Sequence, residues 1–283
     1  MAGDDRRGVM RVRGKTFAWG QCTYLMAIVN VTPDSFSGDG RGIDEAVEHA
    51  VRQWQAGADI LDIGGESTRP GHERIDDAQE IARIAPVIAG IRERIPGAVI
   101  SIDSYKPEVA RAAHDAGADM INSVWGAHPS LIDVAVERRM PFAAMHNQAD
   151  TQYHGDVVDA VVAFLEDAGR RCVERGIPRE HVMLDPGIGF GKTPNQNLRV
   201  LHELHRICEL GYATLLGTSR KSTIGKLTGR EAHERIYGTA ATTALGIAAG
   251  VDIVRVHDVA QQRDVISVSD AIVRNWRPSG WTG

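Results

Sequence analysis

Eight positions along the chain carry side chains that can ionise or exchange hydrogen bonds, and each follows a short apolar run. They are Asn30, Glu66, Asp103, Asn122, His146, Asp185, the Ser219-Arg220-Lys221 group and His257. Any one of them alone could be a turn or capping residue, because such residues commonly end strands. Eight in succession are better explained by a shared site. The sequence therefore predicts a binding surface that combines carboxylate, amide, imidazole and cationic groups.

The segment LDPGIGFGKT (184–193) ends like the phosphate-binding loop of nucleotide hydrolases. That loop has the pattern Gly-x-x-x-x-Gly-Lys-Ser/Thr, and here Pro186 stands where its first glycine belongs. The loop binds phosphate through consecutive backbone N–H groups, and proline has none. The sequence therefore disfavours a nucleotide hydrolase. The glycines of this segment are instead predicted to let the backbone turn sharply while Asp185 faces a ligand.

The apolar runs are rich in Val and Ile, and segments with helical spacing separate them. The predicted strands are 24–30, 58–64, 98–103, 118–122, 141–146, 181–185, 213–219 and 251–257. Three helix-to-strand junctions share one pattern, in which Gly57, Gly117 or Gly250 is expected to stop the helix in a left-handed conformation. Strands that alternate with helices predict a parallel sheet that is covered on both faces.

Eight such units close a (β/α)₈ barrel, and the sequence predicts this α/β fold with catalytic groups at the carboxyl ends of the strands. The alternative is an open doubly wound sheet, but no G-x-G-x-x-G follows the first predicted strand. Residues 9–20 are predicted to form a β-hairpin that turns at Gly14-Lys15 and covers the bottom of the barrel. No linker divides the chain, so residues 1–283 are expected to form a single domain with a catalytic core of about 24–275.

Composition excludes several classes of protein. The formal net charge is -5 and 43% of the residues are hydrophobic, which is ordinary for a globular protein. The negative charge argues against nucleic acid or an anionic membrane as a partner. Cys22, Cys172 and Cys208 form no Cys-x-x-Cys pattern and are expected to be reduced thiols. The charged start of the sequence and the shortness of its apolar runs favour a cytoplasmic protein.

Six motifs, in this order, resemble those of the dihydropteroate synthase family of the folate pathway. They are IVNVTPDSFSGDG, GGESTRPG, ISIDS, LDPGIGFGKT, GTSRKS and IVRVHD, and they extend from about residue 24 to residue 260. The resemblance implies a transferase with a (β/α)₈ barrel, usually a homodimer. The implied reaction joins 6-hydroxymethyl-7,8-dihydropterin diphosphate to 4-aminobenzoate and gives 7,8-dihydropteroate and pyrophosphate. Sulfonamides are expected to compete with 4-aminobenzoate.

The pterin substrate is a flat ring with a polar edge like that of guanine. This edge has N–H and NH₂ donors beside carbonyl and ring-nitrogen acceptors, so carboxylates, an amide and a cation suit it. Asp103, Asn122, Asp185 and Lys221 supply this set from four predicted strands, and they match the positions at which the family binds pterin.

The diphosphate leaving group calls for positive charge in the same site. Arg255 and His257 are two residues apart on the last predicted strand and should therefore point the same way. The resemblance implies that both bind the diphosphate, and that Asn30 helps to hold the diphosphate and Mg²⁺, the expected cofactor. It also implies that Arg255, His257 and Lys221 are the catalytic residues.

The resemblance places the aminobenzoate against three loops. Its expected contacts are Thr68, Arg69 and Pro70 after the second strand, Phe190 after the sixth and Ser222 after the seventh. Phe190 offers an apolar wall, and Ser222 can form a hydrogen bond with the carboxylate. Two alternatives remain, in which Phe190 only packs beneath its own loop and Ser222 only caps a helix.

Two segments depart from the family pattern. Ser123 follows Asn122 where the family usually has aspartate, and NQADTQYHGD (147–156) lacks the usual Gly-x-Pro. The alternatives are a methyltetrahydrofolate methyltransferase on a related barrel and a pterin-binding paralogue without catalytic activity. The segments STRPG and SRKS favour the synthase, because a methyltransferase needs no loop for aminobenzoate.

Overall fold

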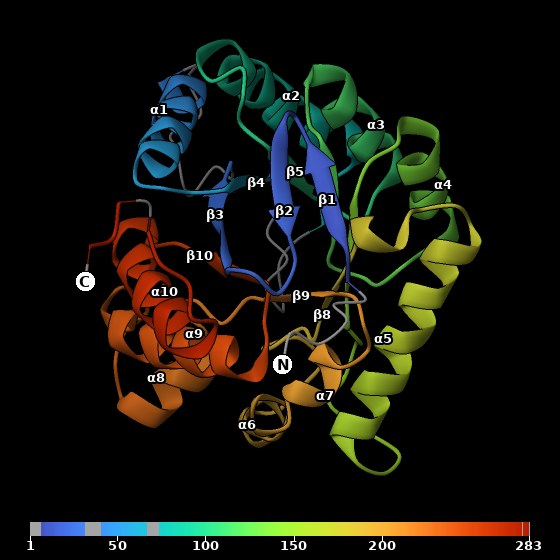
Figure 1. Ribbon diagram of the computed structural model, residues 1–283. Coiled ribbons are helices and arrows are strands. Elements are labelled where there is room, and N and C mark those ends of the chain that lie inside the picture. Colours follow the sequence, from blue (N-terminus) through green and yellow to red (C-terminus); the bar gives the residue numbers. More distant parts are fainter. Residues whose placement is uncertain (1–6, 32–40, 67–73, 279, 283) are drawn as a thin grey trace.

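The chain folds into a closed barrel of eight parallel strands surrounded by helices (Figure 1). The structure is a computed structural model that describes residues 7–31, 41–66, 74–278 and 280–282. The barrel strands are β3 (Tyr24–Asn30), β4 (Ile60–Gly64), β5 (Ile100–Asp103), β6 (Met120–Ser123), β7 (Phe142–Met145), β8 (Val182–Asp185), β9 (Ala213–Leu216) and β10 (Ile253–Val256). Strands that follow one another in the chain pair side by side, and β10 pairs with β3 to close the ring. The predicted (β/α)₈ barrel is therefore confirmed.

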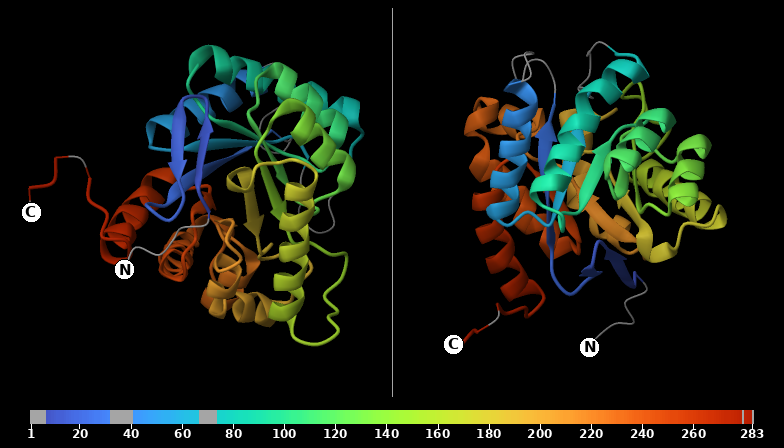
Figure 2. Two further views of the ribbon diagram at one scale, coloured as in Figure 1. Left: turned by 45° about the vertical axis from the view of Figure 1, so that its right-hand side comes forward. Right: turned by 90° about the horizontal axis from the view of Figure 1, so that it is seen from above.

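Helices connect the strands and cover the outside of the barrel (Figure 2). They are α1 (Arg41–Gln55), α2 (Asp77–Arg94), α3 (Pro107–Ala116), α4 (Pro129–Arg138), α5 (Val157–Glu174), α6 (Pro194–His202), α7 (His205–Cys208), α8 (Ser222–Thr228), α9 (Ile236–Ala249) and α10 (Val259–Val273). Short 3₁₀ turns occupy Arg179–His181 and Ala232–Glu234. In the described part of the chain, no helix is both long enough and apolar enough to cross a membrane.

Each of the eight predicted runs overlaps one barrel strand, most strands are shorter than predicted, and β6 extends one residue beyond its run, to Ser123. The first matches at both ends, whereas the run 213–219 is a strand only as far as Leu216. Gly57, Gly117 and Gly250 have φ angles of 103°, 118° and 108°. Each junction therefore uses the positive φ that favours glycine, as predicted.

Two apolar cores stabilise the barrel, one on each side of its wall. Successive side chains of a strand point to opposite faces, so in β3 Leu25 and Val29 pack outward against the helices while Tyr24 and Met26 point inward. The inner core also contains Ile60, Val99, Met120, Met183, Leu215 and Ile253. Two residues beyond four of these, the next inward positions are Asp62, Asn122, Asp185 and Arg255. The interior thus changes from apolar to polar within one step along the strands.

An N-terminal β-hairpin closes the lower end of the barrel (Figure 2). Its strands are β1 (Val9–Val12) and β2 (Lys15–Ala18). The turn is Arg13-Gly14, with φ angles of 53° and 76°, so the prediction of a turn at Gly14-Lys15 is wrong by one residue. Two successive positive φ angles give the hairpin turn that matches the twist of the paired strands. Phe17 and Trp19 are buried in the inner core, so the hairpin acts as a plug.

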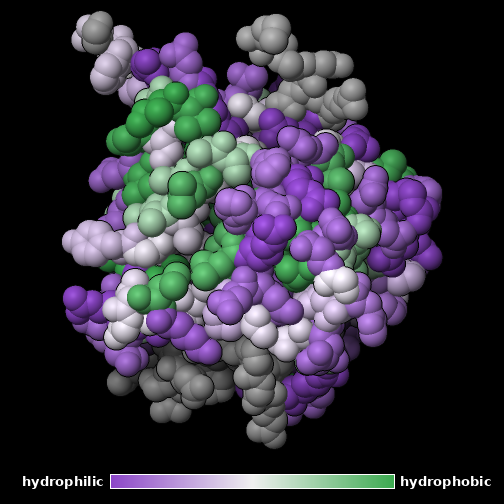
Figure 3. All heavy atoms as spheres, turned by 90° about the horizontal axis from the view of Figure 1, so that it is seen from below, coloured by the Kyte–Doolittle hydropathy of each residue, from purple (hydrophilic) through white to green (hydrophobic). Residues whose placement is uncertain are grey.

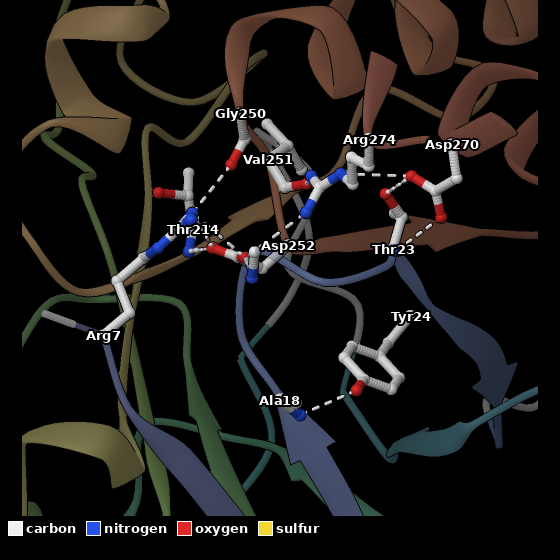
Figure 4. Close-up of polar contacts among 11 residues, drawn as sticks. Arg7, Ala18, Thr23, Tyr24, Thr214, Gly250, Val251, Asp252, Asp270 and Arg274 are labelled. Carbon is white, nitrogen blue, oxygen red and sulfur yellow. Dashed lines mark hydrogen bonds and ion pairs between the residues drawn. The ribbon is translucent and has the colours of Figure 1, made fainter. Parts of the chain in front are cut away.

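A buried carboxylate joins distant parts of the chain beneath the barrel (Figure 4). Asp252 accepts hydrogen bonds from Nη1 of Arg7 at 3.0 and 3.1 Å. It also accepts from the backbone N–H groups of Gly20 at 2.8 Å and Thr214 at 3.0 Å. Arg274, which follows α10, lies 3.9 Å from the same carboxylate. These contacts hold the hairpin, β9 and the end of α10 together below β10.

Candidate active site

A pocket opens at the carboxyl end of the barrel, where about 330 Å³ of empty space includes open solvent at its mouth. Six strands or the loops that follow them contribute its lining. The lining residues are Asp103, Asn122, Val124, Met145, Asp185, Gly187, Ile188, Phe190, Gly217, Lys221 and Arg255. All four residues that the sequence predicted as pterin contacts are among them, and so are Arg255 and Phe190. Side chains that are far apart in the sequence therefore share one cavity.

Arg255 is the centre of a buried ionic cluster in this pocket. Its Nε donates a hydrogen bond to Oδ2 of Asp62 at 2.6 Å, and its Nη2 donates to Oδ2 of Asp103 at 2.5 Å. Nδ2 of Asn122 donates to the same Asp62 oxygen at 3.0 Å. Asp62 has no exposed surface. This one carboxylate therefore orients two residues that line the pocket.

Burial governs the acid–base properties of the cluster. The pKa of Asp103 is raised to about 7, and burial is the main cause. The guanidinium of Arg255 opposes this rise, and the carboxylate of Asp62 adds to it. Burial also raises the pKa of Asp185, although a backbone N–H and a nearby lysine lower it. Burial lowers the pKa of Arg255, but Asp62 and Asp103 more than offset that effect and hold the pKa above its ordinary value. The pocket therefore places the guanidinium cation of Arg255 beside carboxylates whose pKa values are raised.

The glycine-rich loop after β8 forms one wall of the pocket. Oδ1 of Asp185 accepts a hydrogen bond from the N–H of Gly187 at 2.7 Å, and the carbonyl of Gly187 accepts from the N–H of Phe190 at 3.1 Å. Gly187 has a φ of 64°, and a Cβ there would lie 1.9 Å from the carbonyl oxygen of His146. Only glycine meets both conditions. The segment therefore turns sharply at the barrel mouth beside Asp185, as the sequence predicted.

Lys221 extends over this turn from the loop that follows β9. Its Nζ donates to the carbonyl of Ile188 at 2.7 Å and lies 4.0 Å from the centre of the Phe190 ring. A cation at that distance from an aromatic face contributes about 0.5–2 kcal/mol. Phe190 lines the pocket, so it does more than pack beneath its own loop.

Asn30 and His257 are at the mouth of the barrel but are not among the residues that line the pocket. Asn30 ends β3, and a Cβ placed on Gly64 would lie 3.7 Å from its Oδ1 and 3.6 Å from Oδ2 of Asp103. His257 follows β10, and its Nδ1 lies 3.0 Å from Oγ of Ser219. Within the described residues, no three His, Cys, Asp or Glu side chains gather to hold a metal ion.

Only some of the predicted aminobenzoate residues can be placed. Ser222 is exposed and is the first residue of α8, and the N-cap position belongs to Lys221. The alternative that Ser222 caps this helix is therefore wrong. Thr68, Arg69 and Pro70 lie outside the described residues.

The base of the second loop is held by a buried cation between two carboxylates. Nζ of Lys106 lies 2.6 Å from Oε2 of Glu66 and 2.9 Å from Oε2 of Glu80. The hydroxyl of Tyr105 donates to the other oxygen of Glu66 at 3.1 Å. Glu66, which the sequence placed at a strand end, thus belongs to this ionic group rather than to the pocket lining.

Two residues of the site were not predicted. Asp62 lies inside the apolar run ILDIG rather than at its end. Its presence there was the sequence signal that could have identified it, because a charged residue in a buried strand is rare unless it is paired. Lys192 was given no role of its own. It is buried just before α6, which starts at Pro194 with Thr193 as its side-chain cap.

Ser123 is not among the residues that line the pocket, although Asn122 and Val124 on either side of it are. Its hydroxyl donates a hydrogen bond to the carbonyl of Gly126 at 2.6 Å. This placement follows from the alternation of side chains along β6. A carboxylate at position 123 would therefore not join the group formed by Asp62 and Asp103.

Comparison with known proteins agrees with this geometry. The family of pterin binding enzymes matches residues 26–257. The dihydropteroate synthase of Clostridium beijerinckii is 44% identical over 272 residues, which are 94% of this chain and 100% of that protein.

Two solved structures resemble the whole barrel, each with a TM-score of 0.88. One is dihydropteroate synthase from Clostridium difficile in the presence of pteroic acid, which is 45% identical, with 90% of this chain and 98% of that chain covered. The other is the Xanthomonas albilineans enzyme with 4-aminobenzoic acid, which is 40% identical, with 95% and 99% covered. The chain therefore belongs to the dihydropteroate synthases, a family of pterin-binding transferases.

Proposed function

We propose that the dihydropteroate synthase reaction of this chain takes place in the pocket at the top of the barrel. The substrates are 6-hydroxymethyl-7,8-dihydropterin diphosphate and 4-aminobenzoate, and the products are 7,8-dihydropteroate and pyrophosphate. The observation that carries this proposal is the convergence of Asp103, Asn122, Asp185 and Lys221 on one cavity.

The pterin ring binds through its polar edge. Oδ1 of Asp103 is buried and has no hydrogen-bond partner among the described residues. Leaving such an oxygen unpaired costs about 1–3 kcal/mol, and a pterin N–H would relieve that cost. Asn122 donates one N–H of its side-chain amide to Asp62, and its amide oxygen is a second acceptor for the ring. Asp185 supplies a third, and the ammonium of Lys221 donates to the acceptors of the ring.

The diphosphate is held by Arg255, His257 and Asn30. Arg255 uses Nε and Nη2 for its two carboxylate partners, so Nη1 is the nitrogen that it offers to a phosphate oxygen. Asn30 suits Mg²⁺, because this cation takes oxygen ligands and is commonly held by few protein groups together with substrate phosphates. When bound, Mg²⁺ would neutralise charge that develops on the departing pyrophosphate.

The aminobenzoate lies beside the pterin, with Phe190 as an apolar wall and Ser222 as a hydrogen-bonding partner for its carboxylate. Thr68, Arg69 and Pro70 complete this part of the site. The related Xanthomonas structure contains 4-aminobenzoic acid, which supports this compound as the second substrate of the chain. Because sulfonamides mimic the aminobenzoate, we expect them to compete with it.

The reaction forms a C–N bond and breaks a C–O bond at the same methylene carbon. The electron-rich pterin ring can stabilise positive charge at this carbon, so we propose that the C–O bond breaks first and its electron pair leaves with pyrophosphate. The amine of 4-aminobenzoate is neutral near pH 7, so its lone pair attacks without a dedicated base and its proton passes to water. Lys221, Arg255 and His257 contribute by orienting the reactants and balancing charge.

Release of pyrophosphate tests this function directly. The purified protein with Mg²⁺ and both substrates is expected to release pyrophosphate and to form dihydropteroate, and neither substrate alone should suffice. Pterin binding without pyrophosphate release would instead indicate a paralogue without catalytic activity. Transfer of a methyl group from methyltetrahydrofolate would indicate a methyltransferase.

We also infer that the whole chain acts as one domain and forms a homodimer through α8, α9 and α10. Leu227, Tyr237, Leu245, Val268 and Ile272 on these helices are between 61% and 86% exposed. Figure 3 shows hydrophobic surface gathered on the left, the side on which these helices lie in Figure 1. Exposed apolar patches of this kind are typical of protein interfaces. A second copy is the proposed partner, because one apolar face can pair with itself about a two-fold axis.

A further inference from the structure

Lys192 is a buried lysine whose hydrogen-bond partners are all uncharged. Its Nζ lies 2.8 Å from Nδ1 of His146 and donates to the carbonyl oxygens of Gly187 and Phe190, each at 3.1 Å. The residue is only 7% exposed. An ammonium group has three donors, and these three contacts use all of them.

His146 is held firmly in place where β7 ends. Its backbone N–H donates to the carbonyl of Asp185 at 2.9 Å. Its ring stacks on Tyr153 with a centroid distance of 6.1 Å and meets the ring of Phe164 edge-on at 4.8 Å. The hydroxyl of Tyr153 in turn donates to the carbonyl of Gly191 at 2.8 Å. The imidazole is therefore a fixed support for whatever binds to its Nδ1.

Two lysines share the carbonyl groups of the turn that walls the pocket. Lys192 binds the carbonyls of Gly187 and Phe190, and Lys221 binds the carbonyl of Ile188 between them. Because the same turn carries the Phe190 ring and anchors the ammonium of Lys221, a shift of the turn would move both groups. Contacts of this kind lose effectiveness when they are displaced by about 1 Å.

We propose that Lys192, supported by His146, is a positioning residue for pterin binding. It fixes the turn 187–190 and, through that turn, the placement of Lys221 in the pocket. This inference rests on the proposed function of the pocket and deepens it. Lys192 itself need not contact the substrate, since its three donors are already used.

Stability alone does not account for a lysine at this place. Burial lowers the pKa of Lys192 to about 7, against the opposing effect of the Asp185 carboxylate, and Lys221 lowers it further. Burial and the charge of Lys192 lower the pKa of His146 to about 3, so the imidazole remains neutral and can accept. Keeping the amine of Lys192 charged among neutral partners costs free energy, and its lowered pKa reflects that cost. The benefit of Lys192 is therefore expected in the geometry of the pocket rather than in the free energy of unfolding.

The test uses the full-length protein and measures the Kd of 6-hydroxymethylpterin by its fluorescence. The variants are Lys192→Met, which keeps the length of the side chain but removes its donors, and His146→Leu, which removes the acceptor. His146→Asn is the conservative variant, because its amide oxygen can replace Nδ1. Lys226→Met, at an exposed lysine in α8, is the matched control.

Lys192→Met and His146→Leu are expected to raise the Kd of the pterin about tenfold or more, as for loss of a buried hydrogen bond. His146→Asn should recover most of the affinity, and the control should match the wild type. The double variant Lys192→Met/His146→Leu should bind no more weakly than Lys192→Met, because that single change already removes the contact with His146. The KM for the pterin diphosphate should rise in parallel.

Wild-type affinity in Lys192→Met, or equal affinities in His146→Asn and His146→Leu, would overturn the proposal. If Lys192→Met does not fold, the two His146 variants decide the matter without it. Failure of the wild-type protein to bind pterin would instead overturn the proposed function of the pocket. The two failures are therefore distinguishable.

Discussion

Nε of Arg255 lies 2.6 Å from Oδ2 of Asp62, so a fully buried carboxylate from the second barrel strand holds a guanidinium from the last. Asp103 binds the same guanidinium from the strand next to Asp62. Two carboxylates and one arginine leave an excess of negative charge within this cluster. This excess suits a ligand that presents N–H donors.

Removal of the Asp62 carboxylate should impair catalysis more than its remoteness from the substrate suggests. In Asp62→Asn, Arg255 loses a charged hydrogen bond, and we expect kcat/KM for the pterin diphosphate to fall about 10- to 100-fold. Steady-state kinetics with pyrophosphate detection would measure the change. Asp115→Asn, at an exposed carboxylate on α3, is the control. Unchanged kinetics in Asp62→Asn would show that Arg255 does not depend on this partner.

Pterin binding should weaken as the pH falls through the raised pKa of Asp103. The carboxylate accepts hydrogen bonds from the pterin only when it is ionised, and burial raises its pKa to about 7. Between about pH 8 and pH 6 the Kd of a neutral pterin is therefore expected to rise in the wild type. Asp103→Asn should bind weakly throughout and lose most of this pH dependence. A flat profile for the wild type would contradict the assignment.

His146 should make the protein sensitive to acid. Its native pKa of about 3 lies below the ordinary 6.5 because the ring is buried. Between these values the unfolded chain binds a proton that the native chain does not, so the free energy of unfolding falls as the pH falls, by up to about 1.4 kcal/mol per pH unit. Urea denaturation at several pH values should show a smaller loss in His146→Asn. His202→Asn, at an exposed histidine, should behave like the wild type in this range.

An aspartate at position 123 should destabilise the protein rather than improve its activity. The Ser123 hydroxyl is buried and donates to a carbonyl oxygen, and a carboxylate there would face the same oxygen without a proton to share. We expect Ser123→Asp to lower the free energy of unfolding by about 1–3 kcal/mol or more. Thermal unfolding would measure the loss, and Ser123→Thr tests whether the hydroxyl alone suffices. Higher turnover in Ser123→Asp would mean that this position does serve the reaction.

The exposed apolar face of α9 and α10 should control the oligomeric state. Leu245→Glu combined with Ile272→Glu places charge at two sites that are 71% and 77% exposed, so the monomer should fold while the dimer dissociates. Analytical ultracentrifugation across a range of concentrations would reveal the change in mass. Val173→Glu on α5 is the control, away from this face. A wild-type protein that is monomeric at all concentrations would exclude the proposed dimer.

The barrel could be predicted from the sequence because each of its units repeats the same local physics. Apolar runs of strand length, helices with one apolar face and a glycine at three junctions all pointed to parallel strands joined by helices. The ends of the strands were less predictable. The run 213–219 is predicted as one strand, whereas pairing ends at Leu216, just before Gly217, Thr218 and Ser219.

The sequence predicted the site residues at the ends of strands but missed buried residues that act by holding other side chains or loops in place. Asp103, Asn122, Asp185 and Lys221 lie where the carboxyl ends of parallel strands must meet. Asp62 was hidden because the partners that make a buried carboxylate tolerable, Asn122 and Arg255, are remote in the sequence. Lys192 was hidden for the same reason, since its acceptor His146 belongs to another strand.

Arg7, which precedes the hairpin, and Arg274, which follows α10, both contact Asp252. They therefore lie below the place where β10 pairs with β3. A closed sheet has no free edge, and the pairing of the last strand, β10, with the first, β3, is the one that closes this barrel. Arg7 and Arg274 support that pairing from outside the sheet. Loss of Arg7 or of Arg274 would therefore weaken the closure of the barrel itself.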